Sequence, residues 1–181
     1  APTTVQLTSA TPADGAPLAV LSELKAVDAA YPLYGRLTLA NGRTAPALTA
    51  ESVLIGQALA DRLAVRPGDD LRFGTARFRV AGILGDEPDR VGEGFTLGPV
   101  AITALAGLRR TALIQPGSLY TTKYRLRLSQ PARAARVADA LKQQLATAGV
   151  EVKDRDDAAP GASRFIERMG QFLSLIGLAA L

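Results

Sequence analysis

The segment SVLIGQALADRLAVRPGDDLRFGTARFRV, residues 52–80, carries the most information about the architecture of the chain. Residues 52–56 are mostly apolar and lead into a short helix that we predict over residues 57–63. The sequence Arg-Pro-Gly-Asp at 66–69 ends this helix in a turn, because proline fixes φ and glycine tolerates positive φ. An apolar segment, a short helix and a tight turn are therefore expected in succession.

Short predicted strands surround this segment. Residues 71–73 and 77–80 alternate apolar and polar side chains on either side of Gly74, which predicts a β-hairpin. Earlier in the chain, residues 36–39 read as a strand that ends at the turn-forming pair Asn41-Gly42. The middle of the chain is therefore expected to be rich in β-structure.

The flanking segments predict further strands and one longer helix. Residues 4–8 alternate and predict a strand. Residues 18–28 fit a strand or a short helix, and we favour a strand that pairs back on 4–8. Residues 123–128 also alternate, 134–145 carry apolar side chains at helical spacing, and 150–153 read as another short strand. Strand, amphipathic helix and strand in this order predict a βαβ unit.

The composition excludes several common kinds of active site. The chain has 181 residues, 48% hydrophobic and 21% charged, which is enough to bury a substantial core. It has no histidine, cysteine or tryptophan, so imidazole catalysis, thiolate chemistry and disulfides are excluded. Only 5% of the residues are aromatic, which leaves little to stack on nucleic-acid bases. The net charge of +4 fits an ordinary solvated surface or a weak attraction to anionic partners.

Pairs of acidic residues are the remaining candidates for chemistry. They are Asp69 with Asp70, Asp86 with Glu87, and Asp156 with Asp157. All three pairs lie in predicted turns or loops, where water screens them, whereas acid–base catalysis needs carboxylates in contrasting, dry environments. Their spacing also differs from that of a calcium-binding loop. We therefore predict no catalytic residue, no metal site and no cofactor.

The last residues of the chain predict a helix of changing character. From about residue 164 the apolar side chains follow helical spacing, and Arg164, Glu167 and Arg168 make its first part amphipathic. Residues 172–181 carry no charge and amount to about half of the ~20 residues that cross a membrane. This helix is either a buried core helix or the first half of a transmembrane span, and its loss of amphipathicity favours the span.

Several segments resemble the periplasmic domains of MacB/FtsX-type ABC transporter permeases. The block at 53–69, with its short helix and Leu-x-Val-x-x-Gly-Asp ending, looks like a block of these domains, and residues 78–84 resemble the strand that follows it. Residues 25–35, 115–118 and 164–181 look like the YbbP branch, which is related to the LolC/LolE permeases. The resemblance covers nearly the whole chain, and the order of the blocks makes it more specific than any one block.

The resemblance implies an α+β fold with two subdomains. A porter-like βαβ subdomain would comprise residues 1–34 and 120–163, and a β-rich, sabre-like subdomain would be inserted at 35–119. Residues 164–181 would form the stalk and start of a transmembrane helix. In this family a strand and a helix normally precede the segment that begins at Ala1, so one βα element is expected to be missing here.

The resemblance also implies a function without catalysis in this domain. A separate cytoplasmic ATPase subunit would hydrolyse ATP, and the permease would transmit the change to its domain on the periplasmic side of the bacterial inner membrane. The cargo would be hydrophobic or lipid-linked, and a periplasmic protein is a further possible partner; no nucleic acid is expected. An alternative is a regulatory domain that controls an envelope hydrolase, as FtsX-like proteins do. A freestanding soluble enzyme or nucleic-acid-binding protein is the third reading.

Five residues are candidates for a hinge or a partner contact. Tyr31, Leu33 and Tyr34 lie in an apolar segment broken by proline, between the two expected subdomains. Phe95 and Leu97 lie in the acidic, glycine-containing segment 86–98, which is expected to be an exposed loop. The alternative for each group is packing against its own domain.

Overall fold

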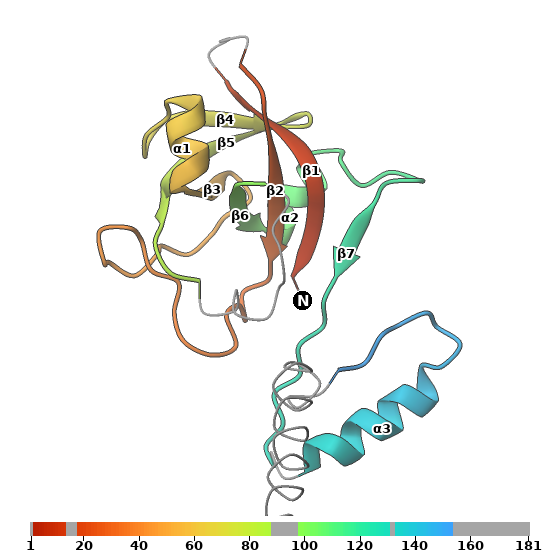
Figure 1. The fold of residues 1–181 in the computed structure, drawn as a ribbon. Coiled ribbons are helices and arrows are strands. Elements are labelled where there is room, and N and C mark those ends of the chain that lie inside the picture. The colour runs from red at the N-terminus through yellow and green to blue at the C-terminus, as the bar shows by residue number, and fades with distance from the viewer. Residues whose placement is uncertain (1, 14–17, 88–97, 131–132, 154–181) are drawn as a thin grey trace, which may run out of the picture. The chain divides into compact units, whose positions relative to one another are not determined.

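A computed structural model describes residues 2–13, 18–87, 98–130 and 133–153 (Figure 1). The chain forms two compact units, Ala1–Arg125 and Leu126–Leu181, and each is described here by itself.

The first unit contains most of the secondary structure. Its elements are β1 (Thr3–Pro12), β2 (Val20–Val27), β3 (Ser52–Gly56), α1 (Gln57–Leu63), β4 (Asp70–Phe73), β5 (Ala76–Leu84), β6 (Val100–Ala104), α2 (Leu105–Arg110) and β7 (Tyr120–Thr122). The two helices each begin directly where a strand ends, β3 for α1 and β6 for α2. The helices are therefore held against the sheet by very short connections.

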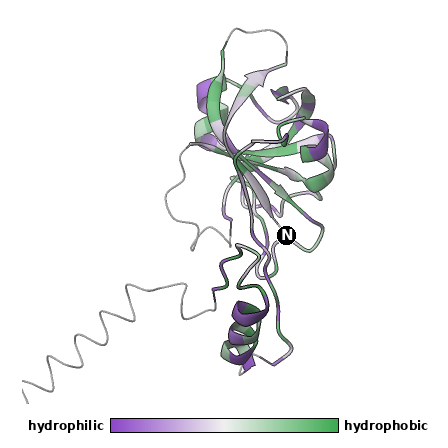
Figure 2. Ribbon diagram, turned by 90° about the vertical axis from the view of Figure 1, so that its right-hand side faces the viewer, coloured by the Kyte–Doolittle hydropathy of each residue, from purple (hydrophilic) through white to green (hydrophobic). Residues whose placement is uncertain are grey.

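The strands form one sheet that closes on itself. Its order is β2-β6-β3-β5-β4-β1-β7, and β2 also pairs with β1. The pairs β2–β6 and β3–β5 are parallel, whereas β1–β2, β1–β4, β3–β6 and β4–β5 are antiparallel. Because β1 pairs with both β2 and β4, these strands make a barrel, with β7 added beside β1 (Figures 1 and 2).

β1 divides its second edge between two neighbours. Residues Ala10, Thr11 and Pro12 pair with β4, whereas Thr3, Thr4 and Val5 pair with β7. Its register with β2 shifts between Val5 and Thr8, which is the signature of a β-bulge. A bulge bends a strand and increases its twist, and this allows β1 to leave β4 and continue along β7.

The barrel interior is the main hydrophobic core. The inward side chains of β4 and β5 alternate with exposed ones, as a half-buried sheet requires. Phe73 and Phe78 meet edge to face inside, with ring centroids 6.0 Å apart. α1 adds Leu59 and Leu63 to the same core. The predicted hairpin around Gly74 is therefore a wall of the barrel.

A second apolar layer covers the outside of β3 and its neighbours. Val53 and Ile55 face the barrel core, while Leu54, between them, belongs to a separate cluster with Leu37 and Ile102. The segment between β2 and β3 supplies this outer layer, and β3 is consequently buried on both faces. This explains why 53–55 form a continuous apolar run without alternation.

The second unit contains one described helix, α3 (Ala134–Gln144). Its ribbon alternates between hydrophilic and hydrophobic residues in Figure 2, and Ala138 is its buried residue. Among the described residues, no helix combines the length and the apolar character that a membrane crossing needs. The predicted terminal helix at 164–181 lies outside the described residues.

Much of the predicted secondary structure is confirmed. The strand at 4–8 and its pairing with 18–28, the helix at 57–63 and the helix at 134–145 are all present, with small changes in their ends. Sequence reasoning did not specify β6 or α2, because the run through Val100–Arg110 has neither strict alternation nor a glycine or proline between strand and helix.

Three predicted strands are wrong. Residues 36–39 make only isolated bridges, Thr38 to Thr44 and Leu39 to Leu84. Residues 123–128 and 150–153 are not strands, so the described part of the second unit contains the helix of the predicted βαβ unit without its strands. Alternation gives a strand two faces but does not supply a neighbouring strand. The pairing of β7 with β1 ends at Thr122, and Lys123 adds one backbone hydrogen bond to the carbonyl oxygen of Pro2.

The boundary between the two compact units differs from the boundaries of the predicted subdomains. β1 and β2, from the segment 1–34, share one sheet with the strands of 35–119. The division falls after Arg125. The assignment of porter-like and sabre-like subdomains stays a prediction.

The end of α1 provides a test of this backbone. Ala64 caps the helix with φ 53°, a left-handed conformation that costs an L-residue about 1–2 kcal/mol. We expect Ala64→Gly to raise the free energy of unfolding by about 0.5–1 kcal/mol, since the relief exceeds the added entropy of the unfolded chain. Ala64→Val at the same exposed position should lower it, because a branched Cβ resists positive φ. Urea denaturation of both variants checks this, and a Gly variant less stable than the parent would contradict it.

Candidate functional site

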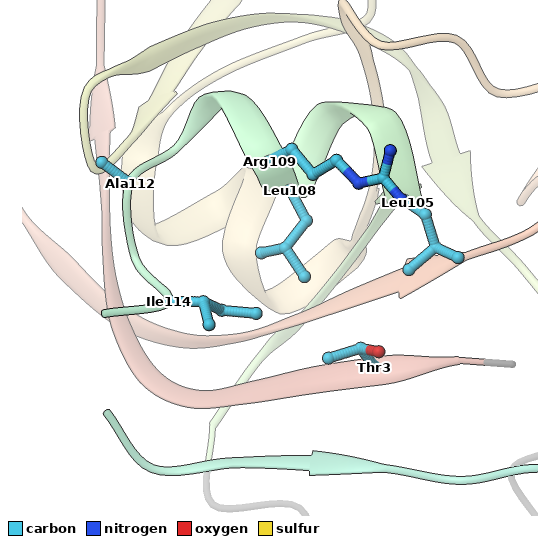
Figure 3. A pocket seen from close by; sticks show the side chains of 6 residues that line it. All are labelled: Thr3, Leu105, Leu108, Arg109, Ala112 and Ile114. Atoms are coloured by element: carbon cyan, nitrogen blue, oxygen red, sulfur yellow. The ribbon is translucent and has the colours of Figure 1, made fainter. Parts of the chain in front are cut away.

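An apolar pocket lies between α2 and the beginning of β1. It has a volume of about 410 Å³ and is lined by Thr3, Leu105, Leu108, Arg109, Ala112 and Ile114. Figure 3 shows the side chains of Leu105, Leu108 and Ile114 in the space between α2 and the strand that carries Thr3. Apolar side chains therefore dominate this concave surface.

The floor of the pocket is continuous with the barrel core. Leu108 is 4% exposed and belongs to the same cluster as Val5, and Leu105 packs against that cluster. Gly107, next to Leu108, lets α2 approach the barrel closely: a Cβ there would stand 2.9 Å from Cε1 of Phe78. α2 is thereby fixed on the core, which gives the pocket a preformed wall.

The opposite side of the pocket is formed by Thr3 of β1, and β7 is the strand that pairs with β1 there. The hydroxyl groups of Thr3 and Thr122 are hydrogen-bonded at 3.1 Å across the two strands. Tyr120 pairs with Val5 two residues further along, so its side chain is on the same face of the sheet as that of Thr3. Ile114, which lines the pocket, is 41% exposed, so the pocket is open to solvent, and Tyr120 on β7 is 49% exposed.

The two arginines at the end of α2 are in different environments. The side chain of Arg110 donates a hydrogen bond to the carbonyl oxygen of Ala50 at 2.7 Å and lies 4.0 Å from a carboxylate oxygen of Glu51. Arg109 lines the pocket and makes no ion pair within the described ranges. Its positive charge therefore stands beside an apolar surface without an acidic neighbour there.

A buried ion pair lies at another place in the same unit. Nζ of Lys25 is 2.5 Å from Oε1 of Glu87, and their side chains are only 2% and 3% exposed. The hydroxyl of Tyr31 donates to the same carboxylate oxygen, and the ammonium group lies 4.9 Å from the centre of the Tyr31 ring. These three residues connect β2, the segment after it and the segment after β5.

The position of Lys25 explains its burial. Its neighbours Leu24 and Ala26 face the barrel core, so the Lys25 side chain projects from the outer face of β2. Tyr31 and Glu87 cover it there. An unpaired ammonium group would be costly in such surroundings, and Glu87 supplies its counter-charge.

The sequence-based expectation for Glu87 is wrong. Asp86 and Glu87 were expected to be screened by water, but Glu87 is only 4% exposed. Asp70, from another of the acidic pairs, binds Nε of Arg79 at 2.6 Å, and Asp156 and Asp157 lie outside the described residues. One sequence signal for the buried pair exists, namely a lysine inside the apolar run Leu24–Val27, but its partner is remote in sequence.

The predicted contact residues are brought together only in part. Tyr31 is half-buried and joined to Glu87, Leu33 is half-buried, and Tyr34 is 61% exposed. Phe95 and Leu97 lie outside the described residues. The hinge or contact role of these five residues stays a prediction. In the described part of the chain, no group of three or more Asp or Glu residues could hold a metal ion.

Comparison with known proteins identifies the family. Residues 1–144 match the model of the MacB-like periplasmic core domain. The chain belongs to this family. It is also 33% identical over 179 residues to the ABC transporter permease YbbP of Escherichia coli (strain K12). That match covers 97% of this chain and 21% of YbbP, so the chain spans about a fifth of the length of this relative.

Two solved structures have a similar fold. The periplasmic region of MacB from Actinobacillus actinomycetemcomitans aligns with a TM-score of 0.53 at 15% identity, over 91% of this chain and 75% of that one. The extracellular domain of the noncanonic ABC-type transporter YknZ from Gram-positive bacteria aligns with a TM-score of 0.51 at 10% identity, over 83% and 77%. The mixed α/β fold and the predicted resemblance to this family are confirmed.

The Lys25–Glu87 pair can be tested by a double-mutant cycle. Lys25→Met removes the ammonium group that faces the buried Glu87 carboxylate, and Glu87→Gln removes the negative charge 2.5 Å from the buried ammonium, so each should lower the free energy of unfolding by about 3 kcal/mol. The double variant removes both charges and keeps an acceptor for Tyr31, so its loss should be smaller than the sum of the single losses.

Asp70→Asn is the matched control, because it breaks an ion pair whose arginine is 64% exposed and should cost less than about 1 kcal/mol. Urea denaturation followed by circular dichroism measures all four proteins. Additive single losses in the double variant, or losses no larger than that of Asp70→Asn, would argue against a coupled buried pair.

Proposed function

We propose that this chain is the extracytoplasmic domain of an ABC transporter permease of the bacterial inner membrane. It couples ATP hydrolysis by a separate cytoplasmic subunit to movement on the periplasmic side, and the movement exports or extracts hydrophobic or lipid-linked cargo. The observation that carries this proposal is the match to the MacB-like periplasmic core domain over 1–144, together with the similarity to YbbP along 97% of the chain.

The architecture of the first unit is suited to transmitting movement. Strands from both ends of this unit, β1 and β7, pair directly, and the barrel closes through β1 and β2. In a closed barrel the strands are hydrogen-bonded to a neighbour on both sides. Such a sheet deforms less easily than separate hairpins do. Force applied at the ends of the domain would therefore move the barrel as one body.

The apolar pocket supports the proposed class of cargo. Its lining of Leu105, Leu108, Ala112 and Ile114 presents hydrocarbon to solvent, and a pocket of about 410 Å³ falls in the range of ~300–1,000 Å³ usual for small-molecule sites. Its wall is also fixed by the close packing of α2 on the barrel. A hydrophobic group is the kind of ligand that such a surface favours.

The proposal predicts that nucleotide moves this domain in the intact transporter. The chain has no cysteine, so Ala58→Cys on the exposed side of α1 gives one labelling site within the domain. We would purify the full-length permease in mild detergent, identify the ATPase that accompanies it, and reconstitute the complex in lipid nanodiscs. Energy transfer from the labelled domain to acceptors in the lipid headgroups should change when ATP is added.

A complex whose ATPase cannot hydrolyse ATP separates the effect of ATP binding from that of ATP turnover. A label at Asn41→Cys, exposed in the segment between β2 and β3, checks that the change is not local to α1. Two results would refute the coupling. One is the absence of any ATPase partner, and the other is an energy transfer that is the same with ATP, with ADP and without nucleotide at both labels. Stoichiometric recovery of an envelope hydrolase with no transported lipid would instead support a regulatory domain over a transporter.

A further inference from the structure

We propose that the pocket between α2 and β1 binds one acyl chain of an anionic amphiphile, with the anionic head at Arg109. This inference rests on the proposed function for the nature of the cargo and assigns the site at which the cargo touches this domain. The occupant is a single hydrocarbon chain that ends in a carboxylate or a phosphate, delivered from the adjacent lipid.

The pocket lining combines aliphatic side chains with one positive charge. Leu105, Leu108, Ala112 and Ile114 supply aliphatic carbon, and Arg109 supplies the one charged side chain among the six lining residues. In Figure 3 the Arg109 side chain extends alongside Leu105 at the side of the pocket, rather than into its centre. An apolar cleft with one cation beside it matches a ligand that is apolar along its length and anionic at its end.

The positive charge of Arg109 also favours an anionic head. Two arginines of the first unit are already paired with acids: Arg79 with Asp70 at 2.6 Å, and Arg110 with Glu51 at 4.0 Å. Arg109 has no such partner in the described ranges, although it is adjacent to Arg110 in the same helix. An anionic head at this place would therefore gain a favourable charge contact without displacing an existing one.

The pocket lies where the strand next to β1 changes from β4 to β7. β4 pairs with β1 only at residues Ala10 to Pro12, and next to Thr3 the neighbouring strand is β7. The core near Val5 is covered at this point by α2, whose Leu108 reaches the same cluster. The pocket thus lies directly over the part of the core that α2 covers, and a hydrocarbon chain in it would pack on that covering layer.

The pocket is formed without a ligand, because α2 is held in place on the barrel. Gly107 fixes α2 against Phe78, and the hydroxyl of Thr111 donates to the carbonyl oxygen of Leu108 at 2.6 Å, which secures the end of the helix. Ala112 follows with φ 53°, a left-handed conformation that is uncommon for alanine and turns the chain toward Ile114. A preformed apolar pocket loses little entropy when a chain enters.

The test is a site-resolved binding measurement on the 181-residue chain without ATP or its partner. The ¹⁵N-labelled chain is titrated with laurate below its micelle concentration, and with dodecyl maltoside, which has a chain of the same length and an uncharged head. Amide shifts from Thr3, from 105–114 and from 120–122 should saturate together with each probe, and calorimetry gives the two dissociation constants.

Three variants separate the head from the chain. Arg109→Gln should weaken laurate binding by about fivefold, the upper range for an exposed charge contact, and leave dodecyl maltoside binding unchanged. Arg62→Gln, in the last turn of α1, is the matched control and should change neither. Ile114→Asp should weaken both probes, and because Ile114 is 41% exposed this variant should still fold, which its amide spectrum verifies.

Several results would overturn the proposal. Shifts confined to residues outside the pocket would do so, as would equal effects of Arg109→Gln and Arg62→Gln on laurate. A pocket that responds to an apolar peptide but to neither amphiphile would be a protein-docking site. Since no nucleotide or partner is present, a failure here leaves the ATP-driven movement of the domain untouched, and a failure of that movement leaves this binding result standing.

Discussion

The barrel of the first unit depends on one strand that serves three neighbours. β1 pairs with β2 along most of its ten residues, with β4 at its end and with β7 at its beginning. The remaining strands β2, β6, β3, β5 and β4 would form an open sheet without it. Closure by β1 buries Val5 and Ala10 and leaves no open edge between β2 and β4.

The pocket lies where this regular barrel is interrupted, whereas the buried ion pair lies on its outer face. The pocket lies beside the part of β1 that pairs with β7 instead of β4, and α2 covers the core there. The buried ion pair lies on the outer face of β2, where Tyr31 and Glu87 cover Lys25. Interruptions of a closed sheet are the places where a rigid domain can offer a binding surface or an attachment without opening its core.

The sequence predicts elements whose signals are local. The apolar segment, helix and turn at 52–69 are present because apolar spacing, a helix and a Pro-Gly turn lie next to one another in the chain. The strand pairing of β1 with β2 was also accessible, since the two strands are consecutive in the sequence. Family resemblance gave the right family for the same reason, because its motifs are contiguous blocks.

Features that depend on distant partners could not be predicted in this way. The alternating residues 123–128 have the pattern of a strand, but strand β7 ends at Thr122, before them. Glu87 stands in an acidic pair that reads as solvated, and its burial is set by Lys25, 62 residues earlier. The pocket joins Thr3 to residues more than a hundred positions later, and its one local signal, the adjacent arginines of α2, does not reveal which of them faces it.

Native-state hydrogen exchange of the 181-residue chain tests most directly whether β1 closes the first unit into one cooperative body. The hydrogen-bonded amides of β1 should exchange with the same opening free energy as those of β3 and β5, because opening the β1 contacts would expose the whole core. Exchange of β1 through a separate, lower-energy opening, with β3 and β5 still protected, would contradict the account.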